Sequence, residues 1–348
     1  MKIIYNYDGA SIDIVEDDKT NNIIYLSLKN NNKYNHYYNF KIDNSNNKVG
    51  TIIIKDFVNS FYYNKKNKYI PYLIKDDKIN KFKEDKVKII DNDYYINIDK
   101  DFIGEISLYP RYVKRDLEQF INTIKENNNI EIKNSPLVEI KIGKQRKKNI
   151  VIFGRIHPGE TLSSYFIEEI IKYILNNENI LNNYSFTIYP MISTTGVENG
   201  EHRYTSNVDL NRIWNKKNIF QEIDYIKNKL IDINPYLLID VHGDEITNID
   251  YIKTNMMFLN DNLGSFKVLK DRNIFYRFLR ALIKQKKIIN IFNMTAREYI
   301  CKKYNCKGIL IELSLEKNDI NSTREKAKIF IKKLLEVLNN ENNDSCKK

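Results

Sequence analysis

Short segments of hydrophobic, β-branched and aromatic residues dominate the first third of the chain. Turns rich in Asn, Asp, Lys and Gly separate them, and no helical spacing of apolar residues interrupts the series. Several short strands in succession are typical of an antiparallel β-sandwich. We therefore predict a sandwich domain over residues 1–110, with strands at 12–15, 23–28, 37–42, 51–54, 86–90, 94–98 and 106–109.

The pattern changes after Pro110. Apolar residues recur at helical spacing from Val113 to Ile124, which predicts an amphipathic helix. Strand and helix patterns then alternate, and such alternation indicates an α/β fold with a parallel or mixed sheet. We assign residues 111–340 to this second domain and expect residues 341–348 to be a disordered tail. The predicted strands are 149–153, 184–189, 236–240, 256–259 and 309–313, and the predicted helices are 162–175, 219–230, 274–288 and 323–338.

The composition favours a two-domain globular protein, because 348 residues of which 42% are hydrophobic can bury a large core. The formal net charge of +11 would suit a nucleic-acid partner. However, 45 of the 56 basic residues are Lys, Asn is abundant and Ala is rare, which indicates a bias towards A/T-rich codons. We interpret the charge mainly as a solvated lysine surface and predict no nucleic-acid partner. The 11 arginines are then expected where Lys cannot replace Arg.

Other features exclude a membrane or secreted protein. No apolar run approaches the about 18 residues that a membrane helix needs, and Asp8 lies where a signal peptide would be apolar. Cys301, Cys306 and Cys346 provide neither a disulfide framework nor the spacing of a cysteine-based zinc site. We therefore expect a cytoplasmic protein without a membrane partner.

Two of the four histidines lie where predicted strands end. His157-Pro-Gly-Glu160 lies between a strand and a helix, and His242 follows the predicted strand at 236–240. The carboxyl ends of strands are where open α/β sheets bind ligands. Two His and one Glu would leave one position of a zinc ion open, as in hydrolytic zinc sites. The alternative is that these residues are ordinary core or surface side chains.

A segment between these histidines concentrates rare residues. Arg203, Asn211, Arg212 and the single Trp214 lie within twelve positions. The guanidinium of Arg is a planar fork suited to carboxylates, and an Asn beside it adds amide donors. An ordinary loop with a structural ion pair remains the alternative.

The chain resembles the zinc carboxypeptidases, and most closely their cytosolic carboxypeptidase branch. That branch also places a β-sandwich before a mixed-sheet α/β catalytic domain, with a Tyr-Pro at the junction, as at Tyr109-Pro110 here. The resemblance rests on specific motifs over residues 100–330 and on pattern alone in the sandwich. The motifs, in the family's order, are His157-Pro-Gly-Glu160-Thr161, Gly196-Val-x-Asn-Gly-x-x-Arg203, Val208-Asp-Leu-Asn-Arg-x-Trp214, Asp240-x-His242-Gly243, Thr295-Ala-Arg297 and Ile309-Leu-Ile-Glu312.

The resemblance implies one Zn²⁺ ion per chain, with His157, Glu160 and His242 as its ligands. It implies that Asp209 hydrogen-bonds the far nitrogen of a ligand histidine. It also implies that Glu312 is the general base, which takes a proton from the attacking water and passes it to the leaving amine.

Four further roles follow from the resemblance. Arg203 would stabilise the developing oxyanion, and Asn211 and Arg212 would bind the terminal carboxylate of the substrate. Arg297 matches the position that lines the pocket for the last side chain. An Arg there implies a preference for C-terminal Glu or Asp, since a guanidinium pairs with a carboxylate and rejects basic or apolar side chains.

The implied function is that of a zinc metallocarboxypeptidase that removes acidic residues from protein C-termini or polyglutamate side chains, tubulin-like tails included. Two alternatives stay open: an aspartoacylase-like zinc deacylase of N-acyl amino acids, and an inactive module that binds acidic tails. The chain departs from the family pattern in having Asp244-Glu245 after the second histidine motif. It also has no Tyr in residues 286–294, before the pocket arginine, and Tyr299 is the nearest.

Overall fold

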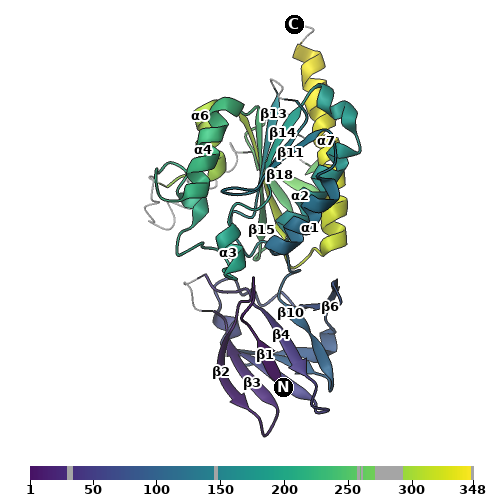
Figure 1. Ribbon diagram of the computed structural model, residues 1–348, viewed down its shortest axis with the longest axis vertical. Coiled ribbons are helices and arrows are strands. Elements are labelled where there is room, and N and C mark those ends of the chain that lie inside the picture. The colour runs from purple at the N-terminus through teal and green to yellow at the C-terminus, as the bar shows by residue number, and fades with distance from the viewer. Residues whose placement is uncertain (30–33, 145–147, 257–258, 260–261, 271–292, 346–348) are drawn as a thin grey trace. The chain divides into compact units, whose positions relative to one another are not determined.

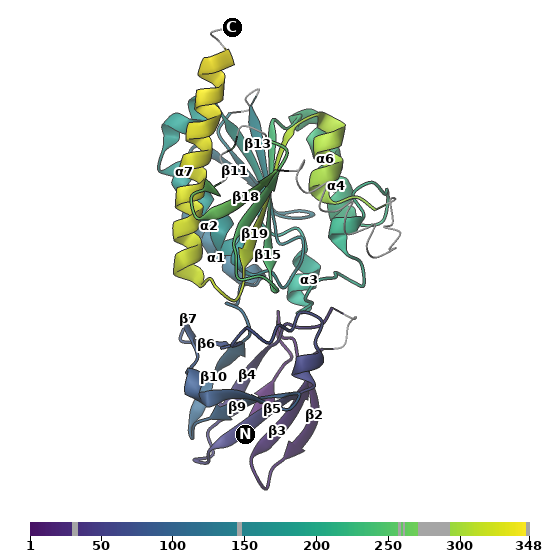
Figure 2. The same ribbon diagram turned by 180° about the vertical axis from the view of Figure 1, so that it is seen from behind.

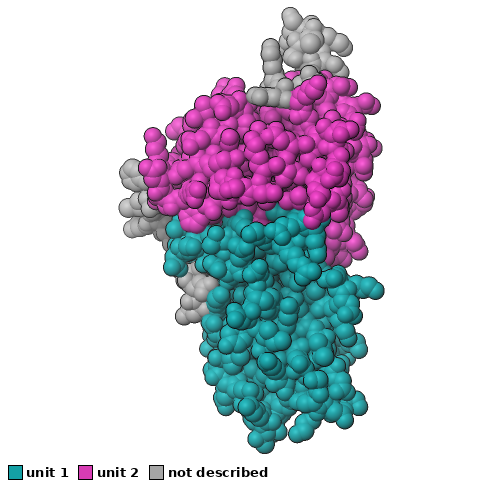
Figure 3. Space-filling model, viewed as in Figure 1, with its two compact units in different colours: residues 1–119, 157–161, 193–209 teal, residues 120–156, 162–192, 210–348 magenta. Residues whose placement is uncertain are grey.

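The computed structural model describes residues 1–29, 34–144, 148–256, 259, 262–270 and 293–345. They form two compact units, coloured separately in Figure 3. Unit 1 consists of Met1–Gln119, His157–Thr161 and Ser193–Asp209, and unit 2 of Phe120–Ile156, Leu162–Ile192 and Leu210–Lys348. The domain boundary expected at residue 110 stays a prediction.

Unit 1 contains a β-sandwich of two five-stranded sheets (Figures 1 and 2). One sheet has the order β1-β4-β10-β6-β7 and the other β2-β3-β5-β9-β8. Buried aliphatic and aromatic side chains fill the space between them, including Leu26, Phe40 and Ile96. The bounds are β1 Lys2–Ile4, β2 Asp13–Asp18, β3 Ile23–Ser27, β4 Asn39–Asn44, β5 Gly50–Lys55, β6 Tyr72–Lys75, β7 Lys78–Lys81, β8 Val87–Ile90, β9 Asp93–Ile98 and β10 Phe102–Ser107.

The sandwich differs from the prediction in two ways. Strands β1, β6 and β7 were not expected, and β3 pairs with β5 in parallel rather than antiparallel fashion. The parallel pair arises because β4, which lies between them in sequence, belongs to the other sheet. The chain therefore crosses over and back before β5 joins β3.

Unit 2 is built on a mixed sheet of nine strands with the order β11-β12-β14-β13-β15-β19-β16-β18-β17. Its central strands β14, β13, β15 and β19 run parallel. Strand β13 is buried at every position, as expected for a parallel strand covered on both faces. The bounds are β11 Ile130–Lys133, β12 Glu139–Ile142, β13 Asn149–Gly154, β14 Ser185–Tyr189, β15 Leu237–Asp244, β16 Tyr251–Thr254, β17 Asn262–Leu263, β18 Phe266–Lys270 and β19 Lys307–Ser314.

Helices cover both faces of this sheet. Helices α2 and α7 lie on one face, and α4 and α6 on the other (Figures 1 and 2). The sequence therefore predicted the mixed-sheet α/β fold and the sandwich before it correctly. The helices are α1 Lys114–Ile124, α2 Leu162–Leu175, α3 Thr194–Glu198, α4 Gln221–Ile233, α6 Ala296–Tyr304 and α7 Ile320–Ser345, with short 3-10 helices at Phe57–Asn59, Glu84–Lys86, Glu178–Asn182 and Leu210–Arg212.

Several predicted elements need correction. The strand expected at 256–259 falls partly on residues 257–258, which lie outside the described residues, and β11, β12, β16, β17 and β18 were not predicted. Helix α7 continues beyond its predicted end into the segment expected to be a tail, because no Gly or Pro stops it there. The helix expected at 274–288 lies outside the described residues. None of the described helices is both long and apolar enough to span a membrane.

Candidate metal centre and active site

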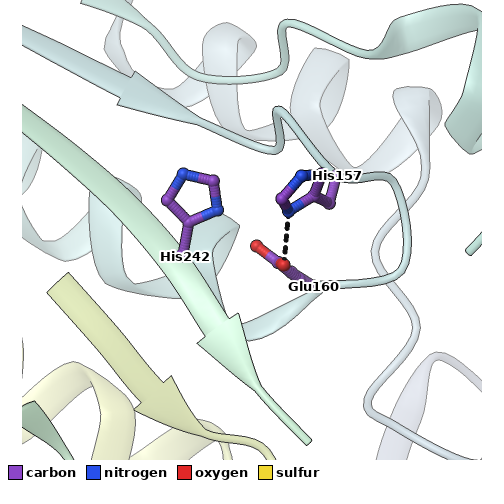
Figure 4. Close-up of side chains that lie close together, drawn as sticks. All are labelled: His157, Glu160 and His242. Carbon is purple, nitrogen blue, oxygen red and sulfur yellow. Dashed lines mark hydrogen bonds and ion pairs between the residues drawn. The ribbon is translucent and has the colours of Figure 1, made fainter. Parts of the chain in front are cut away.

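Three side chains from the predicted zinc motifs lie together in the structure. Ligand atoms of His157, Glu160 and His242 all lie within 4.8 Å of one another, and Figure 4 shows the three side chains converging. All three residues are buried, with exposed fractions of 4%, 4% and 2%. Among the described residues this is the one such group of His, Cys, Asp and Glu.

His157 and Glu160 lie on a tight turn between β13 and α2. The turn is tied to the segment 193–209, because the backbone N–H of Gly159 donates to the carbonyl of His202 at 2.6 Å. A Cβ atom on residue 159 would lie 2.3 Å from Nδ1 of His202. A glycine is therefore required here, and His202, which had no predicted role, supports the turn.

The two nitrogens of His157 face different partners. Its Nδ1 lies 2.6 Å from Oε1 of Glu160, and its Nε2 lies 3.2 Å from Oδ1 of Asp209. The contact with Asp209 is the one that the family resemblance implied. A carboxylate on the outer nitrogen favours the tautomer whose Nδ1 can bind a metal.

His242 lies near the end of β15 and is oriented in a similar way. Its Nε2 lies 3.1 Å from Oδ1 of Asp240 and 3.2 Å from Nδ2 of Asn211. Its other ring nitrogen faces Glu160 (Figure 4). The inward-facing donors are thus two imidazole nitrogens and one carboxylate, a set that fits a single zinc ion with a fourth position open.

Glu312 lies beside His242 on the neighbouring strand β19, in parallel register. Residues side by side in a parallel pair point to the same face of the sheet, so Glu312 and His242 share a face. Arg297, in the first turn of α6, reaches this face too. Gly308 lies four residues before Glu312 on β19, so both residues point to the same face of the sheet. A Cβ atom on Gly308 would lie 3.1 Å from Cγ of Arg297.

Arg203 is held by three residues of unit 1. Its Nε donates to Oδ2 of Asp209 at 3.0 Å and its Nη1 to the hydroxyl of Tyr62 at 3.2 Å. Its guanidinium also lies 5.6 Å from the ring centre of Tyr34. Burial opposes the charge of Arg203, but the attraction of Asp209 outweighs it and raises the pKa. Neither tyrosine could be predicted from the sequence, since both lie more than 140 positions before Arg203.

Asn211 and Arg212 lie on the short 3-10 helix Leu210–Arg212. Asn211 is buried, and its Oδ1 accepts a hydrogen bond of 2.9 Å from the backbone N–H of Ala296 at the start of α6. The Nη1 of Arg212 donates to the carbonyl of Asn211 at 2.7 Å. Tyr299, which is half-buried on α6, accepts a hydrogen bond from Lys303.

His202, whose carbonyl supports the turn, belongs to a cluster of buried rings in unit 1. The ring of His202 lies 5.2 Å from that of Tyr62 and 6.3 Å from that of His36. His36 is completely buried, and its Nδ1 lies 2.8 Å from Oγ of Ser60. Burial, together with the nearby His202, holds the pKa of His36 well below its usual range.

The fold is shared with known metallocarboxypeptidases. A metallo-carboxypeptidase from Burkholderia cenocepacia superposes with a TM-score of 0.78 over 97% of this chain and 99% of that one, at 14% identity. A metallo-carboxypeptidase from Pseudomonas aeruginosa, solved with (2-guanidinoethylmercapto)succinic acid, gives a TM-score of 0.77 with the same coverage and identity. These similarities define the fold class.

The sequence comparisons are more specific. Residues 123–233 match the model of the zinc carboxypeptidase family. It is 28% identical to cytosolic carboxypeptidase 1 of Mus musculus over 171 residues, which are 44% of this chain and 14% of the relative. It is 30% identical to cytosolic carboxypeptidase 3 of Bos taurus over 110 residues, 28% of this chain and 11% of the relative. The match thus covers only a small part of each relative's length.

Proposed function

We propose that this protein is a zinc metallocarboxypeptidase that hydrolyses C-terminal Glu or Asp residues of proteins or polyglutamate side chains. The observation that carries the hydrolytic part is the buried group of His157, Glu160 and His242, with Glu312 in register beside His242. This set provides three ligands and a separate carboxylate that can move protons, which is what amide hydrolysis at a single metal requires.

When bound, zinc would supply Lewis acidity, which polarises the scissile carbonyl and acidifies a water. Glu312 takes a proton from the attacking water and later delivers it to the nitrogen of the leaving residue. Arg203 remains charged, because Asp209 raises its pKa, and it stabilises the negative charge that develops on the carbonyl oxygen. Asp209 has two functions, since its oxygens contact both His157 and Arg203.

The preference for the end of a chain comes from Asn211 and Arg212, which we propose bind the terminal carboxylate. Arg297 would bind the side chain of the last residue. Its stem packs on Gly308, on the face of β19 that also presents Glu312. A guanidinium in that pocket would favour acidic side chains.

The natural substrates that we propose are acidic C-terminal tails, tubulin-like tails included, and the site of action is the cytoplasm. The similarity to proteins named cytosolic carboxypeptidases supports this proposal. The net charge of +11 also supports it, since complementary fields accelerate the encounter with acidic chains.

The experiment is a peptide panel followed by mass spectrometry, with and without a chelator. We expect loss of C-terminal Glu or Asp that stops when the metal is removed. Hydrolysis of N-acyl amino acids instead would assign a deacylase, and binding of acidic tails without hydrolysis would assign an inactive binding module. Release of C-terminal Lys or Phe at rates equal to that of Glu would contradict the proposed specificity.

The role of Arg297 has its own test. Replacing Arg297 with Asp should lower kcat/KM for C-terminal Glu by about 10- to 100-fold, because a charged hydrogen bond is lost, and should favour C-terminal Lys or Arg. Arg297→Lys is the matched control, since it keeps the charge but not the fork. Unchanged Glu release by Arg297→Asp would show that Arg297 does not line the pocket.

A further inference from the structure

Asp240 is a buried carboxylate in unit 2 to which neither the sequence nor the family resemblance gave a role. It lies two residues before His242 on β15, so both side chains point to the same face of the sheet. Asp240 is fully buried, and in the described part of the chain neither of its oxygens accepts a hydrogen bond of good geometry. Among the residues that the structure describes, the one cationic or ring nitrogen within ion-pair distance is Nε2 of His242, at 3.1 Å.

We propose that Asp240 is a positioning residue that sets the tautomer and orientation of His242 for metal binding. The proposal rests on the zinc site proposed above. A buried carboxylate without a proton donor is costly, and the N–H that lies nearest is that of Nε2. When Nε2 carries the proton, Nδ1 keeps its lone pair, and this nitrogen faces Glu160 (Figure 4).

Asn211 favours the opposite tautomer. Because its Oδ1 accepts from the N–H of Ala296, its Nδ2 is a donor, and it lies 3.2 Å from the same Nε2. A bond from Asn211 to Nε2 would require the proton on Nδ1, where it would block the metal. The structure shows the carboxylate of Asp240 at 3.1 Å from Nε2 without the angle of a hydrogen bond. A hydrogen bond to a carboxylate is stronger than one between neutral groups, so our proposal requires that the N–H of Nε2 turns towards Asp240 and that this bond prevails over the one from Asn211. The amide of Asn211 must then donate elsewhere, which agrees with its proposed role at the substrate carboxylate.

With Asp240 in this role, a carboxylate lies beside the outer nitrogen of each histidine ligand, and only the contact between His157 and Asp209 already has the geometry of a hydrogen bond. Asp209 faces Nε2 of His157, and Asp240 faces Nε2 of His242. Such outer carboxylates fix the ring and raise its basicity as a ligand. The two supports differ in origin, since Asp209 is 52 positions from its histidine and Asp240 only two.

The first test is zinc affinity, measured by competition with a chromophoric chelator. Asp240→Asn keeps the size of the side chain but offers Nε2 a second amide donor. We expect zinc affinity to fall by about 10- to 100-fold. Asp244→Asn is the matched control: Asp244 lies two residues after His242, and its carboxylate accepts from the N–H of Ile246 at 2.7 Å. Equal zinc affinities for the two variants and the wild type would overturn the proposal.

The second test does not depend on zinc or on activity. A long-range ¹H–¹⁵N NMR spectrum of the zinc-free wild type reports the tautomer of each of the four histidines, and His242→Gln assigns the signal. We expect the Nε2–H tautomer at His242, and a shift towards Nδ1–H in Asp240→Asn. An Nδ1–H tautomer in the wild type would refute the proposal, even if Asp240→Asn did not fold. A protein that binds no zinc would refute the proposed function but would leave this spectrum as the test of Asp240.

Discussion

His157 and His242 belong to different kinds of backbone. His242 lies in a central parallel strand, where β13 and β19 fix its neighbours by ladder hydrogen bonds. His157 lies on a turn, which is fixed by the carbonyl of His202 and by Asp209. A ligand in a strand takes its position from the sheet, whereas a ligand in a turn needs support from distant segments. The strand ligand should therefore tolerate changes around it better than the turn ligand does.

The largest effect on turnover should come from replacing Glu312, which lies on the strand side of the site and is not a metal ligand. We expect Glu312→Gln to lower kcat by about 10²- to 10⁴-fold, because the general base is lost. Zinc affinity should stay near that of the wild type, because the sheet continues to position His242. Single-turnover kinetics and metal analysis would measure both quantities.

The control for this variant is Glu336→Gln, an exposed residue on α7. A wild-type rate in Glu312→Gln would remove Glu312 from the mechanism. A simultaneous loss of zinc would show that Glu312 helps to hold the ligands in place, and the contrast between strand and turn would then be less sharp.

The turn side is tested by Gly159→Ala. The added Cβ would meet the ring and carbonyl of His202 at 2.3 and 2.9 Å. We expect the free energy of unfolding to fall by about 1–3 kcal/mol, the usual cost of overpacking, and zinc affinity to fall as the turn shifts. Urea denaturation and chelator competition would measure these effects.

Gly104→Ala in strand β10 is the matched control. Its added Cβ would meet Cδ1 of Leu73 at 2.8 Å, so this variant is overpacked as well. The overpacking lies in the sandwich, at a position far from the turn in sequence. We expect this variant to lose stability and keep its zinc affinity. If both variants bind zinc equally well, the turn does not depend on His202.

The smallest effect concerns the ring cluster beneath the turn. Burial and His202 lower the pKa of His36 in the folded state. The unfolded chain therefore takes up this proton first, below about pH 6.5, and stability falls as the pH decreases. The contribution is about 1.4 kcal/mol per pH unit below that point. His36→Gln should reduce the slope of unfolding free energy against pH, measured by urea denaturation with chelator in every sample. An identical slope would contradict this account.

The sequence indicated the candidate site residues more clearly than the residues that hold them in position. The ligand motifs are short and contiguous, so they are visible along the chain. Asp240 was visible in its motif, but its role depends on the direction of the Nε2 atom of His242. Tyr34, Tyr62 and the carbonyl of His202 act through contacts between distant segments, and no spacing in the sequence reports such contacts.

A similar division holds for the fold. Strands such as β13 and helices such as α2 were predicted because long apolar runs or helical periods mark them. Strands β11 and β12 are only four residues long, and β11 is exposed at alternate positions. Such short elements at the edge of a sheet acquire their structure from pairing, so the local pattern carries little information.

The hydrogen bond between Tyr62 and Arg203 bears on how this protein can be divided or recombined. A shortened chain beginning at residue 111 would keep all nine strands of the large sheet, yet it would lack both tyrosines that hold Arg203. We therefore expect that only a chain that contains both the sandwich and the large sheet keeps Arg203 in place. Exchange of sandwiches between related proteins is expected to succeed only where the incoming one presents aromatic side chains at the positions of Tyr34 and Tyr62.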